Sequence, residues 1–290
     1  MTRAPARRRS IVLGAIHPNA GLEAAYRRKL EALVDEMHAS LLYWLRASYR
    51  ANSPEIAQDA MSPAMALRAA MRKLAIRWLK RFDEAAPELA KYFATNATAR
   101  VDGSLKSILK RSGFAVEFTM TREANDVMQA TIGEQVGLIK SIASQHLSEV
   151  EGLVMRSVST GRDLGTLTNE LQQRYGVTRR RAALIARDQN NKATATITRV
   201  RQRSLGITQA KWLHSNGGKE PRKSHLEADG KIFDIDKGML IDGDYIFPGQ
   251  LINCRCVSRS ILPALTLSDT GTASRPLLAS TIKGATADAD

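Results

Sequence analysis

Apolar side chains recur at intervals of three and four through much of the chain before Gly161. Because about 3.6 residues complete one turn of an α-helix, this spacing places them on one helix face. Three such stripes can be traced, and the third is long enough for a helix of roughly thirty residues or more. We expect all three to pack against neighbouring helices, since burial is the usual role of an apolar helix face. They are formed by Tyr26, Leu30, Leu33, Met37, Leu41 and Trp44, then by Leu67, Met71, Leu74, Trp78 and Phe82, and finally by Ile132, Val136, Ile139, Ala143, Leu147, Val150 and Val154.

Local signals mark where these helices begin and end. Ser62–Pro63 predicts a helix start, because proline is favoured in the first helical turn. Pro87 is expected to interrupt that helix, since proline removes one backbone hydrogen bond. Further on, we expect one helix to end at Gly176 and the next to begin with Thr178 as its cap and to run to about Leu205.

The residue pattern of the sequence changes after Ile207. Gly-Gly, Asp-Gly and Pro-Gly pairs separate short apolar runs, which is typical of turns between short strands. We therefore expect an α+β protein that is predominantly α-helical, with long N-terminal and central helices. The expected segments are a basic flexible arm at 1–18, an N-terminal helical region at 19–120, long central helices with a basic face at 121–206, a compact turn-rich α+β module at 207–263 and a flexible C-terminal tail at 264–290.

The charge balance points to an anionic partner. The chain has 43 Lys and Arg against 29 Asp and Glu, a formal net charge of +14, and nucleic acid is the first candidate for such a balance. Aromatic residues are not interleaved with the central cations, so we expect salt-sensitive contacts to a double-stranded DNA backbone, or to an acidic protein surface. The alternative is that these arginines pair with acids elsewhere in the chain. The candidate contact residues are Arg7, Arg8, Arg9, Arg179, Arg180, Arg181, Arg187, Lys192, Arg199, Arg201 and Arg203.

Several classes of protein are disfavoured. The sequence has no uncharged apolar run of transmembrane length, so no membrane anchor is expected. It has no phosphate-binding loop and no nucleophile elbow, so neither catalysis nor a small-molecule substrate is expected.

Cys254 and Cys256 are the two cysteines of the chain. Their spacing disfavours a disulfide, because strand residues two apart hold their Cβ atoms too far apart. We expect both to pack beside Trp212 or Phe247. A structural zinc site remains an alternative, with the ligands His214, His225, Cys254 and Cys256; no other cofactor is expected. A zinc-dependent nuclease using His225, Asp229 and the two cysteines is a second alternative.

Taken together, the stretch beginning "IARDQNNKATATITRVRQRSLG" and the closing "FPGQLINCRCVSRSILP" resemble the phage Mu F-like head morphogenesis proteins, also called minor head or minor capsid proteins. The similarity extends from about Leu138 to Pro263. One departure is that Asn216 and Gly217 stand where members often carry an acid, which weakens the case for catalysis. The signature begins with Ala186–Gln189 and Gly206 and continues through Trp212, Arg222, His225, Asp229, Gly230, Pro248, Asn253, Cys254, Arg255 and Cys256.

The resemblance implies a structural protein of a tailed phage rather than an enzyme. It would act in capsid assembly near the portal, with the portal protein and other capsid proteins as partners. It would reside in the virion, inside the capsid, and in the host cytoplasm during assembly.

Overall fold

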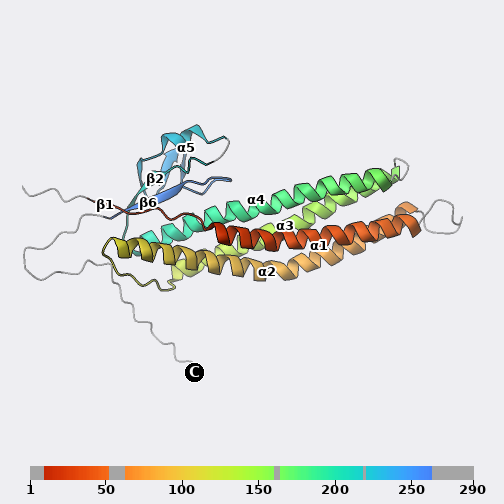
Figure 1. Cartoon of the computed structure of the whole chain (residues 1–290), viewed down its shortest axis with the longest axis horizontal. Coiled ribbons are helices and arrows are strands. Elements are labelled where there is room, and N and C mark those ends of the chain that lie inside the picture. Colours follow the sequence, from red (N-terminus) through yellow and green to blue (C-terminus); the bar gives the residue numbers. More distant parts are fainter. Residues whose placement is uncertain (1–9, 52–62, 160–163, 218–219, 263–290) are drawn as a thin grey trace, which may run out of the picture. The chain divides into compact units, whose positions relative to one another are not determined.

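The structure is a computed structural model, and it describes residues 10–51, 63–159, 164–217 and 220–262 (Figure 1). Of the described residues 70% are helical, in five helices, and a small antiparallel sheet module accompanies them, which confirms the predicted α+β, predominantly helical class. No described helix combines the length and apolar character needed to cross a membrane. The predicted arginines at 7–9 and the predicted tail at 264–290 lie outside the described residues.

The chain divides into two compact units. The helical unit is formed by Pro18–Thr98 and Asp126–Ala193, and the sheet unit by the described residues of Met1–His17, Ala99–Asn125 and Thr194–Asp290. This division differs from the consecutive segments expected from the sequence, because three long helices each contribute residues to both units.

The helical unit is built from parts of α1 (Ala20–Ala51), α2 (Pro63–Arg111), α3 (Arg122–Ser159) and α4 (Leu164–Ser204), which run alongside one another in Figure 1. The second apolar stripe is buried along its whole length, and so is the first as far as Leu41. Trp44 is an exception, since it is 46% exposed, whereas the neighbouring Leu45 is 1% exposed. A step of four from Leu41 therefore continues the stripe, and the predicted step of three does not.

Two predicted helix breaks are wrong. α2 continues through Pro87, which is exposed, while Ala86 and Ala90 on either side are buried. Likewise, α4 is one continuous helix, and Thr178 lies inside it rather than at a cap. Its hydroxyl donates to the carbonyl of Arg174, one turn earlier, at 3.0 Å. In both helices the burial of apolar residues on each side outweighs the local breaking signal.

The sheet unit contains a four-stranded antiparallel sheet in the order β1–β6–β2–β3, with strands β1 (Ile11–Val12), β2 (Gln209–Leu213), β3 (Ile232–Asp234) and β6 (Val257–Leu262). Strands β4 (Met239–Ile241) and β5 (Asp244–Ile246) form a separate antiparallel pair, and α5 (Lys223–Glu227) is a short helix.

The predicted flexible arm at 1–18 is corrected by β1. Ile11 pairs with Leu262 and Val12 with Ile261, both on β6. The next residue, Leu13, is 1% exposed. The end of the expected arm is therefore part of the sheet, because its apolar residues supply an edge strand.

Candidate functional site

His225, Cys254 and Cys256 meet in the core of the sheet unit. His225 lies on α5, and the two cysteines lie between a turn at Leu251–Cys254 and the start of β6. The Nδ1 atom of His225 is 3.5 Å from the sulfur of Cys254 and 3.6 Å from that of Cys256. The three residues are each at most 3% exposed. The predicted packing of both cysteines beside Trp212 is confirmed, since all of them belong to one buried cluster.

The two thiols act electrostatically as a pair. A hydrogen bond from Cys256, helped by the backbone N–H groups of Cys256 and Gly249, lowers the pKa of Cys254 to about 5. The hydrogen bond to Cys254, together with burial, raises the pKa of Cys256. The pair is thus arranged to share one proton, with the negative charge favoured on Cys254. Both thiols are free of disulfide bonds.

Local backbone features position this cluster. Arg222 precedes α5 and its guanidinium donates to the carbonyl of Ile252 at 3.0 Å, which ties the helix to the cysteine turn. Asn253 has φ of 61°, a left-handed conformation that asparagine tolerates better than most residues. The side chain of Asp229 accepts the backbone N–H of His214 at 2.8 Å, and Gly230 follows with φ of 75°. These residues of the predicted signature therefore shape the site rather than line a surface.

The other signature residues have different environments. Trp212 packs edge-on against His225, with ring centroids 5.3 Å apart, and Pro248 is buried. Arg255 is exposed. His214 is buried but does not join the cluster, because its ring nitrogen faces the side chain of Asn216 at 3.0 Å. The structure thus brings together three of the four residues named as zinc ligands.

The predicted basic face of α4 is largely engaged inside the protein. Arg179 pairs with Glu31 at 3.0 Å and with Asp35 at 3.3 Å. Lys192 pairs with Asp188 one turn earlier at 3.0 Å. For these two residues the alternative, pairing with acids elsewhere in the chain, holds.

The other cations of α4 in the helical unit differ in their partners and in their exposure. Arg181 hydrogen-bonds Gln145 and Ser141. Arg187 is half-buried and Arg180 is exposed.

Within the sheet unit, two more predicted contact residues have partners. The Arg199 guanidinium lies 3.9 Å from the centre of the Phe247 ring, and burial lowers its pKa. Arg203 pairs with Asp236 at 2.5 Å and with Glu123 at 3.3 Å.

Arg201 is the clearest correction, because it is 2% exposed and cannot meet a partner at the surface. Its guanidinium donates to both carboxylate oxygens of Asp102, at 2.7 and 2.8 Å, and to the carbonyl of Thr119 at 2.9 Å. A buried cation needs such pairing to offset its desolvation.

The polar residues of α4 instead form buried networks. Gln189, in the "ARDQ" part of the signature, accepts a hydrogen bond from Gln135 at 2.6 Å and donates to Glu134 at 2.9 Å. Gln135 in turn accepts the hydroxyl of Tyr26 at 2.8 Å. The chain of bonds links α1, α3 and α4 within the helical unit, so this signature residue holds helices together.

An exposed basic face lies elsewhere, on α2, and was not predicted. It consists of six exposed cations on the first part of the helix, and we call it the α2 basic face. Residues 64–82 contain no acid, which is the sequence signal that could have revealed it. The α2 basic face comprises Arg68, Arg72, Lys73, Arg77, Lys80 and Arg81.

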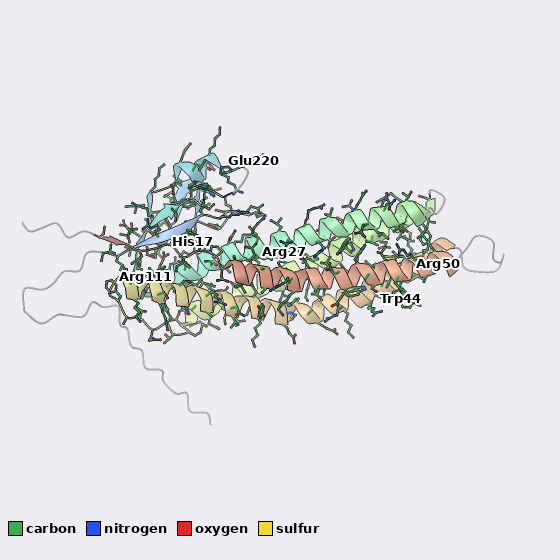
Figure 2. All side chains as sticks on the ribbon, in the orientation of Figure 1. His17, Arg27, Trp44, Arg50, Arg111 and Glu220 are labelled. Atoms are coloured by element: carbon green, nitrogen blue, oxygen red, sulfur yellow. The ribbon has the colours of Figure 1, made fainter. Side chains whose placement is uncertain are left out.

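Apolar side chains are exposed beside this face. Ile76 and Met65 on α2 are among them, and so is Trp44 of α1, whose position on that helix is labelled in Figure 2. Trp44 lines a pocket together with Ser48, Ala70, Lys73, Leu74 and Arg77. Cationic and apolar side chains thus share one surface of the helical unit.

Comparison with known proteins shows similarity over part of the chain. Residues 148–259 match the family described as phage Mu protein F like protein. A Haemophilus influenzae protein, described as an uncharacterized protein, is 29% identical over 210 residues, which cover 70% of this chain and 46% of that relative. The matching part of the chain therefore spans less than half the relative's length. No solved structure matches.

The family match extends from the end of α3 through all of α4 to β6. It includes the buried network residue Gln189 and the cluster of His225, Cys254 and Cys256. The signature that pointed to this family is thus contained in the matching region. Residues 148–259 are therefore similar to the phage Mu F-like proteins, as the resemblance in the sequence predicted.

Proposed function

We propose that this protein is a structural component of phage heads, acting in head morphogenesis near the portal without enzymatic activity. The observation that carries the proposal is the phage Mu F-like region at residues 148–259. Its partners would be the portal protein and other capsid proteins. It would be found in the virion, inside the capsid, after assembly in the host cytoplasm.

We further propose that the α2 basic face contacts packaged double-stranded DNA. The six cations are all exposed and extend over 14 residues of helix, from Arg68 to Arg81, about 20 Å along the axis. Cations presented by flexible side chains neutralise phosphates without reading bases, so the binding would be independent of sequence. This assignment replaces the α4 cations, most of which already have partners inside the protein.

The nuclease alternative receives no support from the site. A metal-activated water must reach the phosphodiester bond that it attacks. His225, Cys254 and Cys256 are each at most 3% exposed, so their side chains do not present an open surface to a DNA strand.

Co-purification during head assembly tests the main proposal. Tagged protein should bring down the portal protein when the two are co-expressed with the major capsid protein. Heads assembled without the protein should be reduced in number or should fail to deliver DNA. Normal, infectious heads without it, together with no recovery of portal, would contradict the proposal.

A further inference from the structure

We propose that His225, Cys254 and Cys256 bind a zinc ion that fastens α5 to the segment leading into β6. The three residues are separated by 29 and 31 positions in the sequence, and the fold brings their ligand atoms within 4.8 Å of one another. Two sulfurs and one imidazole nitrogen are ligand types that zinc prefers in proteins.

The distances fit tetrahedral coordination. Zinc binds thiolate sulfur at about 2.3 Å and imidazole nitrogen at about 2.0–2.1 Å, so tetrahedral angles separate the sulfur and nitrogen atoms by about 3.6 Å. The two observed separations from Nδ1 of His225 are 3.5 Å to Cys254 and 3.6 Å to Cys256. An ion could therefore be placed between these atoms without rearranging the fold.

A set of hydrogen bonds explains the geometry less well. One imidazole nitrogen offers either a single lone pair or a single N–H, so it forms one strong hydrogen bond. Here two sulfurs lie at nearly equal distances from the same nitrogen of His225. A shared metal ion accounts for both separations at once.

The surroundings of the sulfurs also suit thiolate ligands. The backbone N–H of Gly249 faces the sulfur of Cys254 at 3.4 Å. The buried indole N–H of Trp212 has no hydrogen-bond partner among the described residues, and Trp212 belongs to the same buried cluster as Cys256. Such outer donors commonly orient and stabilise the ligands of a metal.

The size of this part of the chain gives a physical reason for a metal. Strands β3, β4 and β5 have three residues each, and the buried cluster around Trp212 has nine members. Small modules with little apolar core often depend on a metal or disulfide for stability. Among the described residues three ligands meet, which leaves the fourth tetrahedral position for water or another small ligand.

Cobalt titration of the full-length protein tests the site directly, with Co²⁺ in place of zinc. The wild-type protein should bind about one ion per chain and show sulfur-to-cobalt charge-transfer absorption. Cys254→Ser and His225→Gln should each weaken cobalt binding by at least about tenfold. Losses of about tenfold to a hundredfold already follow when residues that only hydrogen-bond the metal ligands are changed. The matched control is His214→Gln, since His214 is a buried histidine of the same unit outside the cluster, and it should bind as the wild type does.

Measurements on the wild type alone guard against variants that fail to fold. Zinc should raise the melting temperature of metal-free protein and protect both thiols from a thiol reagent. Absence of charge-transfer absorption, with thiols that react equally fast with and without zinc, would overturn the site. Metal binding without any rise in melting temperature would overturn its role in fastening the module.

Discussion

Replacing Asp102 with alanine is expected to destabilise the sheet unit by about 3–5 kcal/mol, the cost of leaving a buried guanidinium without its counter-charge. The Arg201 side chain is 3% exposed, so water cannot replace the missing carboxylate. The variant would lack two short charge-assisted hydrogen bonds, of 2.7 and 2.8 Å. Only the bond to the Thr119 carbonyl and the packing against the Phe118 ring would remain.

Substitution of the partner, Arg201, should reduce the stability of the sheet unit by less. Arg201→Met leaves a carboxylate that is 20% exposed and that water can partly solvate. The double variant Asp102→Ala, Arg201→Met removes both charges, and we expect it to recover most of the stability, because an apolar replacement of a buried pair is often close to neutral. The coupling between the two positions should therefore be large.

Urea denaturation with a probe in the sheet unit measures these changes as shifts of the midpoint at constant slope. Arg203→Met is the matched control, since its side chain is 34% exposed and its pair with Asp236 should contribute less than about 1 kcal/mol. An Asp102→Ala shift no larger than that of the control would refute the inference that burial makes this pair costly to break.

Three further experiments probe the packing and the pH response. Gly238→Ala should lower the stability of the sheet unit by about 1–3 kcal/mol in urea denaturation, because Gly238 has φ of 88° and a Cβ would lie 2.8 Å from a backbone oxygen. A midpoint equal to that of the wild type would contradict this expectation, because it would show that the turn moves to accommodate the Cβ. Gln135→Ala should cost more than Tyr26→Phe, since it leaves the Tyr26 hydroxyl without its acceptor and the Gln189 side-chain oxygen without its donor, at about 1–3 kcal/mol for each buried group. Equal midpoints would argue against the network. Burial lowers the pKa of His146 to about 4, below the value of about 6.5 for unfolded histidine, so the unfolded state binds the extra proton first. Stability should thus fall by about 3 kcal/mol as pH drops from about 6.5 to about 4 and level off below, and His146→Gln should remove this component when the two pH profiles are compared.

The apolar stripes could be predicted because helical burial depends on residues three and four positions apart. The stripe on α2 is buried from Leu67 to Phe82 as expected. The exception on α1 shows the limit of that reasoning, since both Trp44 and Leu45 are apolar and one step along the helix decides which of them is buried.

The spacing of polar residues on α4 did not predict whether they are buried or exposed. Periodicity indicates that polar residues share a face, but not whether water or protein lies against it. Arg201 is satisfied by Asp102, 99 positions away, and Gln189 by Gln135, 54 positions away. Such partners are brought together by tertiary packing, which local patterns do not encode.

The cysteine and histidine cluster was predictable in part. The sequence places two histidines in the module with the two cysteines, and either could approach them. The turn at Asp229–Gly230 and the link from Arg222 to Ile252 select His225, while His214 faces Asn216. The α2 basic face was visible as an acid-free run of cations, yet the denser run on α4 was the more conspicuous feature.

The salt dependence of DNA binding tests most directly whether the α2 basic face contacts DNA. Arg72→Gln, Lys73→Gln and Arg77→Gln together should weaken binding to double-stranded DNA of any sequence. They should also lower the slope of log affinity against log salt by up to about 2.7, because each phosphate that is no longer neutralised removes about 0.9 from that slope. A control with Lys223, Lys231 and Lys237 of the sheet unit changed to Gln removes the same charge and should keep the wild-type slope. An equal decrease of slope in both triple variants, or wild-type binding by the α2 variant, would contradict the account.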